Sequence, residues 1–162
     1  MSRPQSGCKA APCMYNAYMH DVQPNPRGQL MALLHTAGTV QAHAEVKLAA
    51  VGLSLAKLGA LTALSEAGES MPLSQLAERL SCVKSNITQL VDRLEADGLV
   101  ARSPDPSDRR ARLAVLTPAG REAYDKGTRI YEETERDLLG ALDPEEARQL
   151  AALMEKLERR RS

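Results

Sequence analysis

The chain has 162 residues, and its 21 basic and 21 acidic side chains leave no formal net charge. Hydrophobic residues make up 43% and charged residues 26%, a composition that excludes a disordered chain. There is no apolar run of the ~18 residues that a membrane span needs, no secretory signal and no disulfide-type cysteine spacing, so we expect a cytoplasmic protein without a membrane partner.

The core must be built largely without aromatic side chains, because the chain has no Phe and no Trp. Leu, Ala, Val and Met then do the packing, which favours helices over a sheet sandwich. Basic residues gather in 98–121, whereas 122–162 carry an excess of acids. A basic stretch within a neutral protein fits a small contact patch for DNA, and it also fits chance.

A long helix is predicted after a Pro-rich segment, residues 1–26, which we expect to be flexible. Apolar residues then recur at three- and four-residue steps, predicting one helix of about 24 residues that ends before Gly52. This stripe comprises Leu30, Leu33, Leu34, Ala37, Val40, Ala44, Leu48 and Val51. Ser54 is expected to cap a second helix that runs to about Ala67.

Two shorter helices are predicted next. A short extended segment at 71–73 precedes a helix that Ser74 is expected to cap, and a turn at Ser81–Cys82 leads to a helix over 84–97. Gly98 stands where a left-handed helix cap belongs.

The helix over 84–97 has two distinct faces. Its apolar positions form one stripe, which we expect to be buried: Ile87, Leu90, Val91 and Leu94. Polar residues gather opposite: Ser85, Asn86, Gln89, Asp92 and Arg93, with Thr88 on a flank. Hydroxyl, amide and guanidinium groups read base edges or hold phosphates. The alternative interpretation is an ordinary solvated helix face.

A hairpin follows, with short strands at 99–103 and 112–116 and a polar loop between them. The loop region carries Asp108, Arg109, Arg110 and Arg112. An Arg on a protruding tip is able to enter the DNA minor groove, and an Asp two residues earlier is able to orient it by a charge-assisted hydrogen bond. The alternative is a charged turn that only keeps the hairpin soluble.

Two final helices are predicted from strong start signals. Thr117–Pro118 begins a helix to about Leu142, and Asp143–Pro144 begins the last one, which ends in a run of Arg. Two short helices joined by a tight turn and followed by a hairpin are the order of a winged helix-turn-helix. The sequence therefore predicts a mainly α fold with a small β-hairpin wing.

Residues 72–120 contain the motifs LAERL, ITQLVDRLEADGLVAR, DPSDRRA and LTPAG. With these motifs the segment resembles the MarR family of transcription regulators, and the flanks match by pattern only, over about 27–160. It implies a winged helix-turn-helix DNA-binding domain at 53–117. It also implies a helical dimerisation region, made of a helix at 27–52 and the C-terminal helices at 118–162.

The resemblance further implies a homodimer that binds double-stranded DNA at a palindromic operator, with half-sites about one turn, ~10 bp, apart. The wing Arg is then Arg110 and its orienting acid Asp108. The candidates in the major groove are Lys84, Ser85, Asn86, Thr88 and Gln89, with Arg93 at phosphate. We expect a sequence-specific repressor that a small ligand releases from DNA.

Two positions depart from the family pattern. Val83 stands where relatives have Ser or a similar cap, so the helix over 84–97 is expected to start without an ordinary cap or with a different one. Cys82 stands where an aliphatic residue is usual, and its plain interpretation is a small buried hydrophobe.

Release of DNA has two candidate causes. Family members respond to small anionic or phenolic compounds, which implicates a cleft with His35, His43, Arg121 and Tyr124, although solvated His and packing Tyr are the plainer interpretation. The alternative is a thiol-based oxidant sensor that uses Cys8, Cys13 or Cys82. A sensor needs a lowered pKa and a partner, and Lys9 beside Cys8 is the support for it in the sequence.

Other classes have little support. There is no GxSxG, P-loop, HExxH or GxGxxG, and the His and Cys residues show no metal-ligand spacing, so we expect neither an enzyme nor a metal or other cofactor. A dimeric adaptor that does not bind DNA is the alternative outside regulation. The DxR element at Asp108–Arg110 argues against it.

Overall fold

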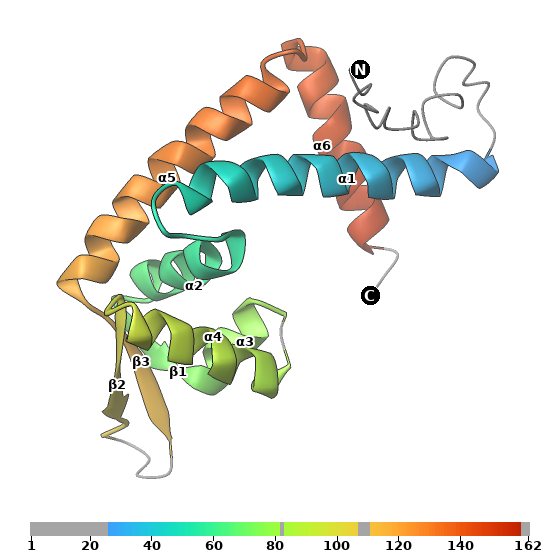
Figure 1. Cartoon of the computed structure of the whole chain (residues 1–162). Helices are drawn as coiled ribbons and strands as arrows, with labels where there is room; N and C mark the ends of the chain where they lie inside the picture. Colours follow the sequence, from blue (N-terminus) through green and yellow to red (C-terminus); the bar gives the residue numbers. More distant parts are fainter. Residues whose placement is uncertain (1–25, 82, 107–110, 160–162) are drawn as a thin grey trace, which may run out of the picture. The chain divides into compact units, whose positions relative to one another are not determined.

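The computed structural model describes residues 26–81, 83–106 and 111–159. These residues form the helices α1 (Pro26–Ala49), α2 (Leu55–Glu66), α3 (Leu73–Arg79), α4 (Lys84–Ala96), α5 (Pro118–Leu139) and α6 (Pro144–Arg159), and the strands β1 (Ser70–Pro72), β2 (Val100–Pro104) and β3 (Arg112–Leu116) (Figure 1). The predicted mainly α fold with a small hairpin is confirmed. None of the helices in these ranges is long and apolar enough to span a membrane.

The chain divides into two compact units, Met1–Thr39 and Val40–Ser162, so that the boundary lies within α1. In the first unit, the described residues are those of α1 before the boundary. The second unit holds α2 to α6 and all three strands. The residues that the sequence predicts to contact DNA, from Lys84 to Arg112, all belong to this second unit.

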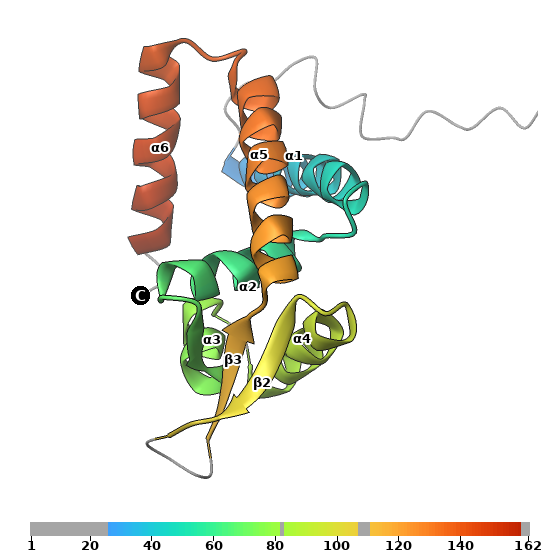
Figure 2. The same cartoon turned by 90° about the vertical axis from the view of Figure 1, so that its left-hand side faces the viewer.

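The short extended segment predicted at 71–73 is β1, which joins the hairpin as a third strand. The strand order is β1-β3-β2 and both pairings are antiparallel, with Met71 opposite Ala114 and Ala114 opposite Arg102. Figure 2 shows β2 and β3 side by side below α5. The pairing with β1 ties the hairpin to the residues that lead into α3.

Several predicted helix starts are confirmed by capping hydrogen bonds. The Ser54 hydroxyl accepts a bond from the Lys57 amide at 3.2 Å, and the Thr117 hydroxyl accepts one from the Gly120 amide at 2.9 Å. The Asp143 carboxylate accepts bonds from the amides of Glu145 and Glu146. Each bond satisfies a donor that the first turn of a helix leaves unpaired.

The prediction that Ser74 caps a helix was wrong. Helix α3 begins at Leu73, Pro72 takes the capping position, and no side chain caps the first turn. The reason is that Pro72 is also the last residue of β1, paired with Leu113, so the strand passes directly into the helix. The end of α5 also differs: it lies at Leu139 instead of Leu142, with Gly140 next.

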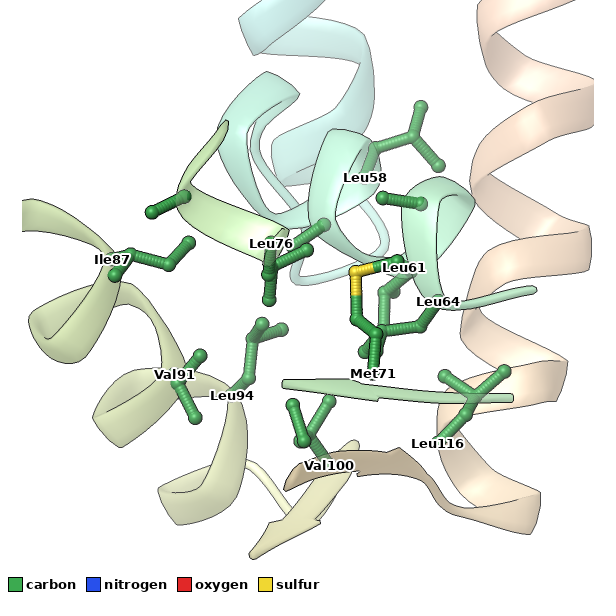
Figure 3. Close-up of a cluster of buried hydrophobic side chains, with 14 of the residues drawn as sticks. Leu58, Leu61, Leu64, Met71, Leu76, Ile87, Val91, Leu94, Val100 and Leu116 are labelled. Atoms are coloured by element: carbon green, nitrogen blue, oxygen red, sulfur yellow. The ribbon is translucent and has the colours of Figure 1, made fainter. Parts of the chain in front are cut away.

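The core lies between α2, α3, α4 and the sheet. Figure 3 shows side chains from all three helices and from the strands pointing toward one another. The largest core side chains that are less than 2% exposed are Leu61, Leu64, Leu76, Val91 and Leu94, together with Leu48 of α1. The predicted stripe of α1 is divided: Ala44 and Leu48 are buried, whereas Leu30 and Leu34 are exposed.

Candidate nucleic-acid interface

Helix α4 separates its apolar and polar residues as predicted. Ile87, Val91 and Leu94 are buried in the core, and Leu90 is partly buried. The candidates for reading DNA are all exposed in the described chain: Ser85, Asn86, Thr88, Gln89 and Arg93. The backbone of Lys84 begins the helix, and its side chain lies outside the described residues. The helix therefore presents hydroxyl, amide and guanidinium groups from a rigid apolar base.

The start of α4 has no side-chain cap, which confirms the expectation from Val83. The backbone oxygen of Val83 accepts bonds from the amides of Asn86 at 3.0 Å and Ile87 at 3.3 Å, but among the described residues no side chain caps the first turn. The other end is well closed, because Gly98 has a φ of +72° and the Leu99 amide reaches the Leu94 carbonyl at 2.9 Å. Packing and lateral contacts must therefore hold the start of the helix.

The turn before α4 is tight. Ser81 has a φ of +50°, a left-handed conformation that is uncommon for a residue other than glycine. The Ser81 amide bonds the Glu78 carbonyl at 3.0 Å, and the Arg79 guanidinium bonds the Ala63 carbonyl of α2 at 3.0 Å. The Arg79 bond ties the end of α3 to α2, and the Ser81 bond closes the turn after α3. Cys82 lies outside the described residues.

The hairpin is described up to its tip. Pro104 pairs with Arg112, and the Asp105 amide bonds the Ala111 carbonyl at 3.3 Å. Arg112 is exposed at the base of the loop. Asp108, Arg109 and Arg110 lie outside the described residues, so their roles stay predictions.

Sequence reasoning missed Arg102, which lies in the middle of β2. Its guanidinium contacts three residues of α4: the carboxylates of Asp92 and Glu95 and the carbonyl oxygen of Thr88. A signal for this contact existed, since an Arg follows a helix that carries Asp and Glu on one face. Nothing in the local pattern showed that β2 would lie against that face.

A cavity of about 580 Å³ lies between α2, α3 and α5. Its lining includes Tyr124 but not the other three residues predicted for effector binding. His43 is exposed on α1, Arg121 is exposed and paired with Glu69, and His35 is an exposed residue of the first unit. The lining residues that the sequence did not indicate include Thr62, Glu66, Arg79, Tyr131 and Glu132.

Known proteins share both sequence and fold with this chain. The sequence model of the MarR family matches residues 53–111. The transcriptional activatory protein BadR of Rhodopseudomonas palustris is 36% identical over 99 residues, which are 60% of this chain and 53% of that protein. The chain spans about half the length of the first curated relatives that it matches.

Two crystal structures are similar in fold to this chain. A MarR family transcriptional regulator from Streptomyces coelicolor has a TM-score of 0.73 at 28% identity and covers 82% of this chain and 92% of its own. A mutant MarR from E. coli, complexed with operator DNA, has a TM-score of 0.71 at 21% identity and covers 90% of this chain and 99% of its own. Residues 53–111 therefore match the MarR family, and the fold of the chain is similar to that of a MarR family transcriptional regulator.

Proposed function

We propose that this chain is a transcription regulator that binds double-stranded DNA sequence-specifically through α4 and the wing. The observation that carries the proposal is α4 itself, whose apolar face is buried and whose polar face is exposed within a winged helix-turn-helix. This is how such a fold presents a recognition helix to the major groove. The basic residues of 98–121 and the regulators among its relatives give further support.

The proposed contacts divide by chemistry. Ser85, Asn86, Thr88 and Gln89 carry groups that hydrogen-bond to base edges, so they would specify the sequence. The cations Lys84, Arg93, Arg109 and Arg112 would hold phosphates and position the protein. Arg110, oriented by Asp108, would enter the minor groove.

The proposal is tested first by binding to the DNA upstream of the chain's own gene, over a series of salt concentrations. Affinity that falls steeply with salt is expected, because phosphate contacts release counterions. Arg110→Ala is expected to weaken specific binding by about 1–3 kcal/mol. Binding that is absent or independent of salt would contradict the proposed DNA binding. An affinity of Arg110→Ala equal to that of the wild type at matched salt would contradict the role of Arg110.

A comparison of two substitutions separates reading from positioning. Gln89→Ala is expected to change the sequence preference, whereas Lys84→Ala is expected to weaken binding to all sequences alike. Binding to a set of operators with single base changes measures both. An equal loss on every sequence for both variants would remove Gln89 from the reading set.

A homodimer on an inverted repeat is part of the proposal. Helix α6 buries none of its side chains in the described chain, and it exposes one apolar stripe, which comprises Leu150, Leu153, Met154 and Leu157. Helix α1 exposes a second set, which includes Leu30, Leu33 and Leu34. Apolar surface of this kind needs a partner, and a second copy supplies matching surface by symmetry. We therefore assign dimerisation to the segments 27–52 and 118–162.

The dimer is tested by light scattering on the purified protein. Leu153→Glu is expected to yield monomers, because it places a charge in the apolar stripe of α6. Ala152→Glu is the matched control, since it adds the same charge to the same helix away from the stripe. A Leu153→Glu protein that stays dimeric would show that α6 does not form the interface.

For the control of DNA binding, we propose a small aromatic effector in the cavity between α2, α3 and α5. Tyr124 and Tyr131 line this cavity and offer aromatic faces. The Arg79 guanidinium is already paired with Glu66 at 3.4 Å, so an anionic effector would have to compete for it. Aromatic acids and aromatic amines, tested for release of DNA, distinguish the two charges.

The thiol-based alternative rests on Cys8, Cys13 and Cys82, which lie outside the described residues. Release of DNA by peroxide, reversed by a thiol reductant, would support it, and release by an aromatic compound alone would support the cavity.

We propose repression as the direction of control, because a dimer seated on a promoter excludes other proteins. The relative BadR is named an activatory protein, and a reporter gene measured with and without this chain decides the direction.

A further inference from the structure

Arg102 joins the two elements that the proposed function directs to DNA. Its strand, β2, leads into the wing, and its side chain lies on α4. We infer that Arg102 is a positioning residue, which fixes the recognition helix relative to the wing and thereby sets the preference for the operator over other DNA. The inference rests on the proposed function, and it names a residue that adjusts the preference for the operator.

The contacts of Arg102 span two turns of α4. Nη1 donates to Oε2 of Glu95 at 3.0 Å, and Nη2 donates to Oδ1 of Asp92 and to the Thr88 carbonyl at 3.4 Å. The backbone amide of Arg102 also donates to Oε1 of Glu95 at 3.3 Å. Thr88, Asp92 and Glu95 stand at successive four- and three-residue steps, so they form one line along the helix. One side chain therefore holds the helix at three points.

The position of Arg102 in the sheet makes this contact directional. Arg102 lies opposite Ala114 of β3, and two residues later Pro104 pairs with Arg112 at the base of the wing. A guanidinium held by the sheet transmits the position of the hairpin to α4. Arginine suits this role, because its planar group donates to several acceptors at once, whereas an ammonium acts as a point charge.

Helix α4 has a particular need for such a contact. Its first turn has no side-chain cap, and the residues proposed to read DNA lie in and just after that turn. The buried face, with Ile87, Val91 and Leu94, holds the helix against the core. Apolar packing alone is non-directional, so the angle between helix and wing depends more on the directed bonds of Arg102.

The same contacts add little to the stability of the fold. The side chains of Arg102, Asp92 and Glu95 are 27%, 53% and 42% exposed, and exposed ion pairs contribute little to folding. The cost of losing them should therefore appear in recognition and not in unfolding. This difference allows a positioning role to be separated from a structural one.

The experiment compares Arg102→Ala, the double variant Asp92→Asn/Glu95→Gln and the triple variant. The readout is the ratio of affinities for the operator and for a random duplex, at matched salt. Lys57→Ala is the control, because it removes a comparable ion pair, with Asp97 at 2.7 Å, that lies at the far end of α4 and does not involve β2. Thermal unfolding of each protein verifies that it is folded.

We expect Arg102→Ala to lower the ratio by about three- to tenfold, the range set by one or two exposed ion pairs. The double variant should lower the ratio similarly, although its loss of two negative charges should tighten binding to random DNA. The triple variant should lose no more than the single changes, because all of them break one contact. Lys57→Ala should leave the ratio unchanged.

Two results of the affinity measurements would overturn the inference. A double variant that keeps the ratio would show that the contact does not position α4. Additive losses in the triple variant would show that Arg102 touches DNA itself. A wild-type protein without preference for its operator would instead overturn the proposed function. In that case, amide hydrogen exchange tests whether Arg102 holds α4. Faster exchange in α4 but not in α2, seen in both Arg102→Ala and the double variant, would support the contact. Unchanged exchange in α4 would refute it.

Discussion

The helices of the winged domain and helix α6 contrast in how they use the same residue type. Leu61, Leu64 and Leu94 of the winged domain are fully buried, whereas Leu153 and Leu157 of α6 are 59% and 53% exposed. Both sets recur at helical spacing. The difference is that the described chain supplies partners for the first set and not for the second. Periodicity therefore identifies an apolar face without telling what covers it.

Helix α1 shows both situations along one stripe. Ala44 and Leu48 are buried in the second unit, while Leu30 and Leu34, in the first, are exposed. A continuous apolar stripe thus serves the core of the chain over part of its length and leaves the rest for another surface. The following predictions test this division, in order of expected size.

The largest effect is expected in the core of the winged domain. Leu94→Ala should lower the free energy of unfolding by about 2–5 kcal/mol, because it removes a fully buried side chain and leaves a cavity. Denaturant unfolding measures this at several protein concentrations. The matched change Leu157→Ala should instead weaken the proposed dimer, so that stability depends less on protein concentration than in the wild type. If both variants lost a similar free energy of unfolding at every protein concentration, the winged domain and α6 would not differ in this respect.

Gly120→Ala should be the next in size. The Cβ of an alanine at position 120 would overlap the carbonyl oxygen of Leu99, and it would lie 2.9 Å from Cδ1 of Leu116. The start of α5 therefore approaches the backbone after α4 too closely for any side chain. We expect a loss of about 1–3 kcal/mol in denaturant unfolding. A loss below the error of measurement would show that the two segments separate readily.

The opposite sign is expected for a glycine in α1. Among the described residues, no heavy atom lies within 4 Å of a Cβ added to Gly38. Gly38→Ala should therefore stabilise the helix by about 0.5–1 kcal/mol, because glycine loses more backbone freedom on folding. Thermal unfolding and helical circular dichroism measure the change. A destabilised protein would indicate that a partner packs closely against Gly38.

The smallest effect concerns the start of α6. Hydrogen bonds from Arg148 and then Gln149 lower the pKa of Glu145 below its ordinary value of 4.5. The ionised carboxylate thus stabilises the fold above that ordinary pKa, and this contribution is lost as pH falls through the lowered pKa. Arg148→Ala should raise the pKa of Glu145, as measured by NMR titration of its carboxyl group. An unchanged titration would show that Arg148 does not bond Glu145 in solution.

Much of the fold followed from local signals. The caps Ser54, Thr117 and Asp143 and the left-handed Gly98 lie where the sequence placed them, because each acts within one helical turn. The two faces of α4 followed from its period. The cavity was anticipated only through Tyr124, since its lining comes from three helices far apart in sequence.

By itself, the sequence determined the helices, the caps Ser54, Thr117 and Asp143, and the polar face of α4, because these depend on residues a few positions apart. The tertiary structure decided that β1 joins the sheet, that Pro72 and not Ser74 precedes α3, and that Arg102 lies against Asp92 and Glu95. These features depend on where distant segments meet, and packing against the common core sets that meeting. A local pattern does not show where distant segments meet.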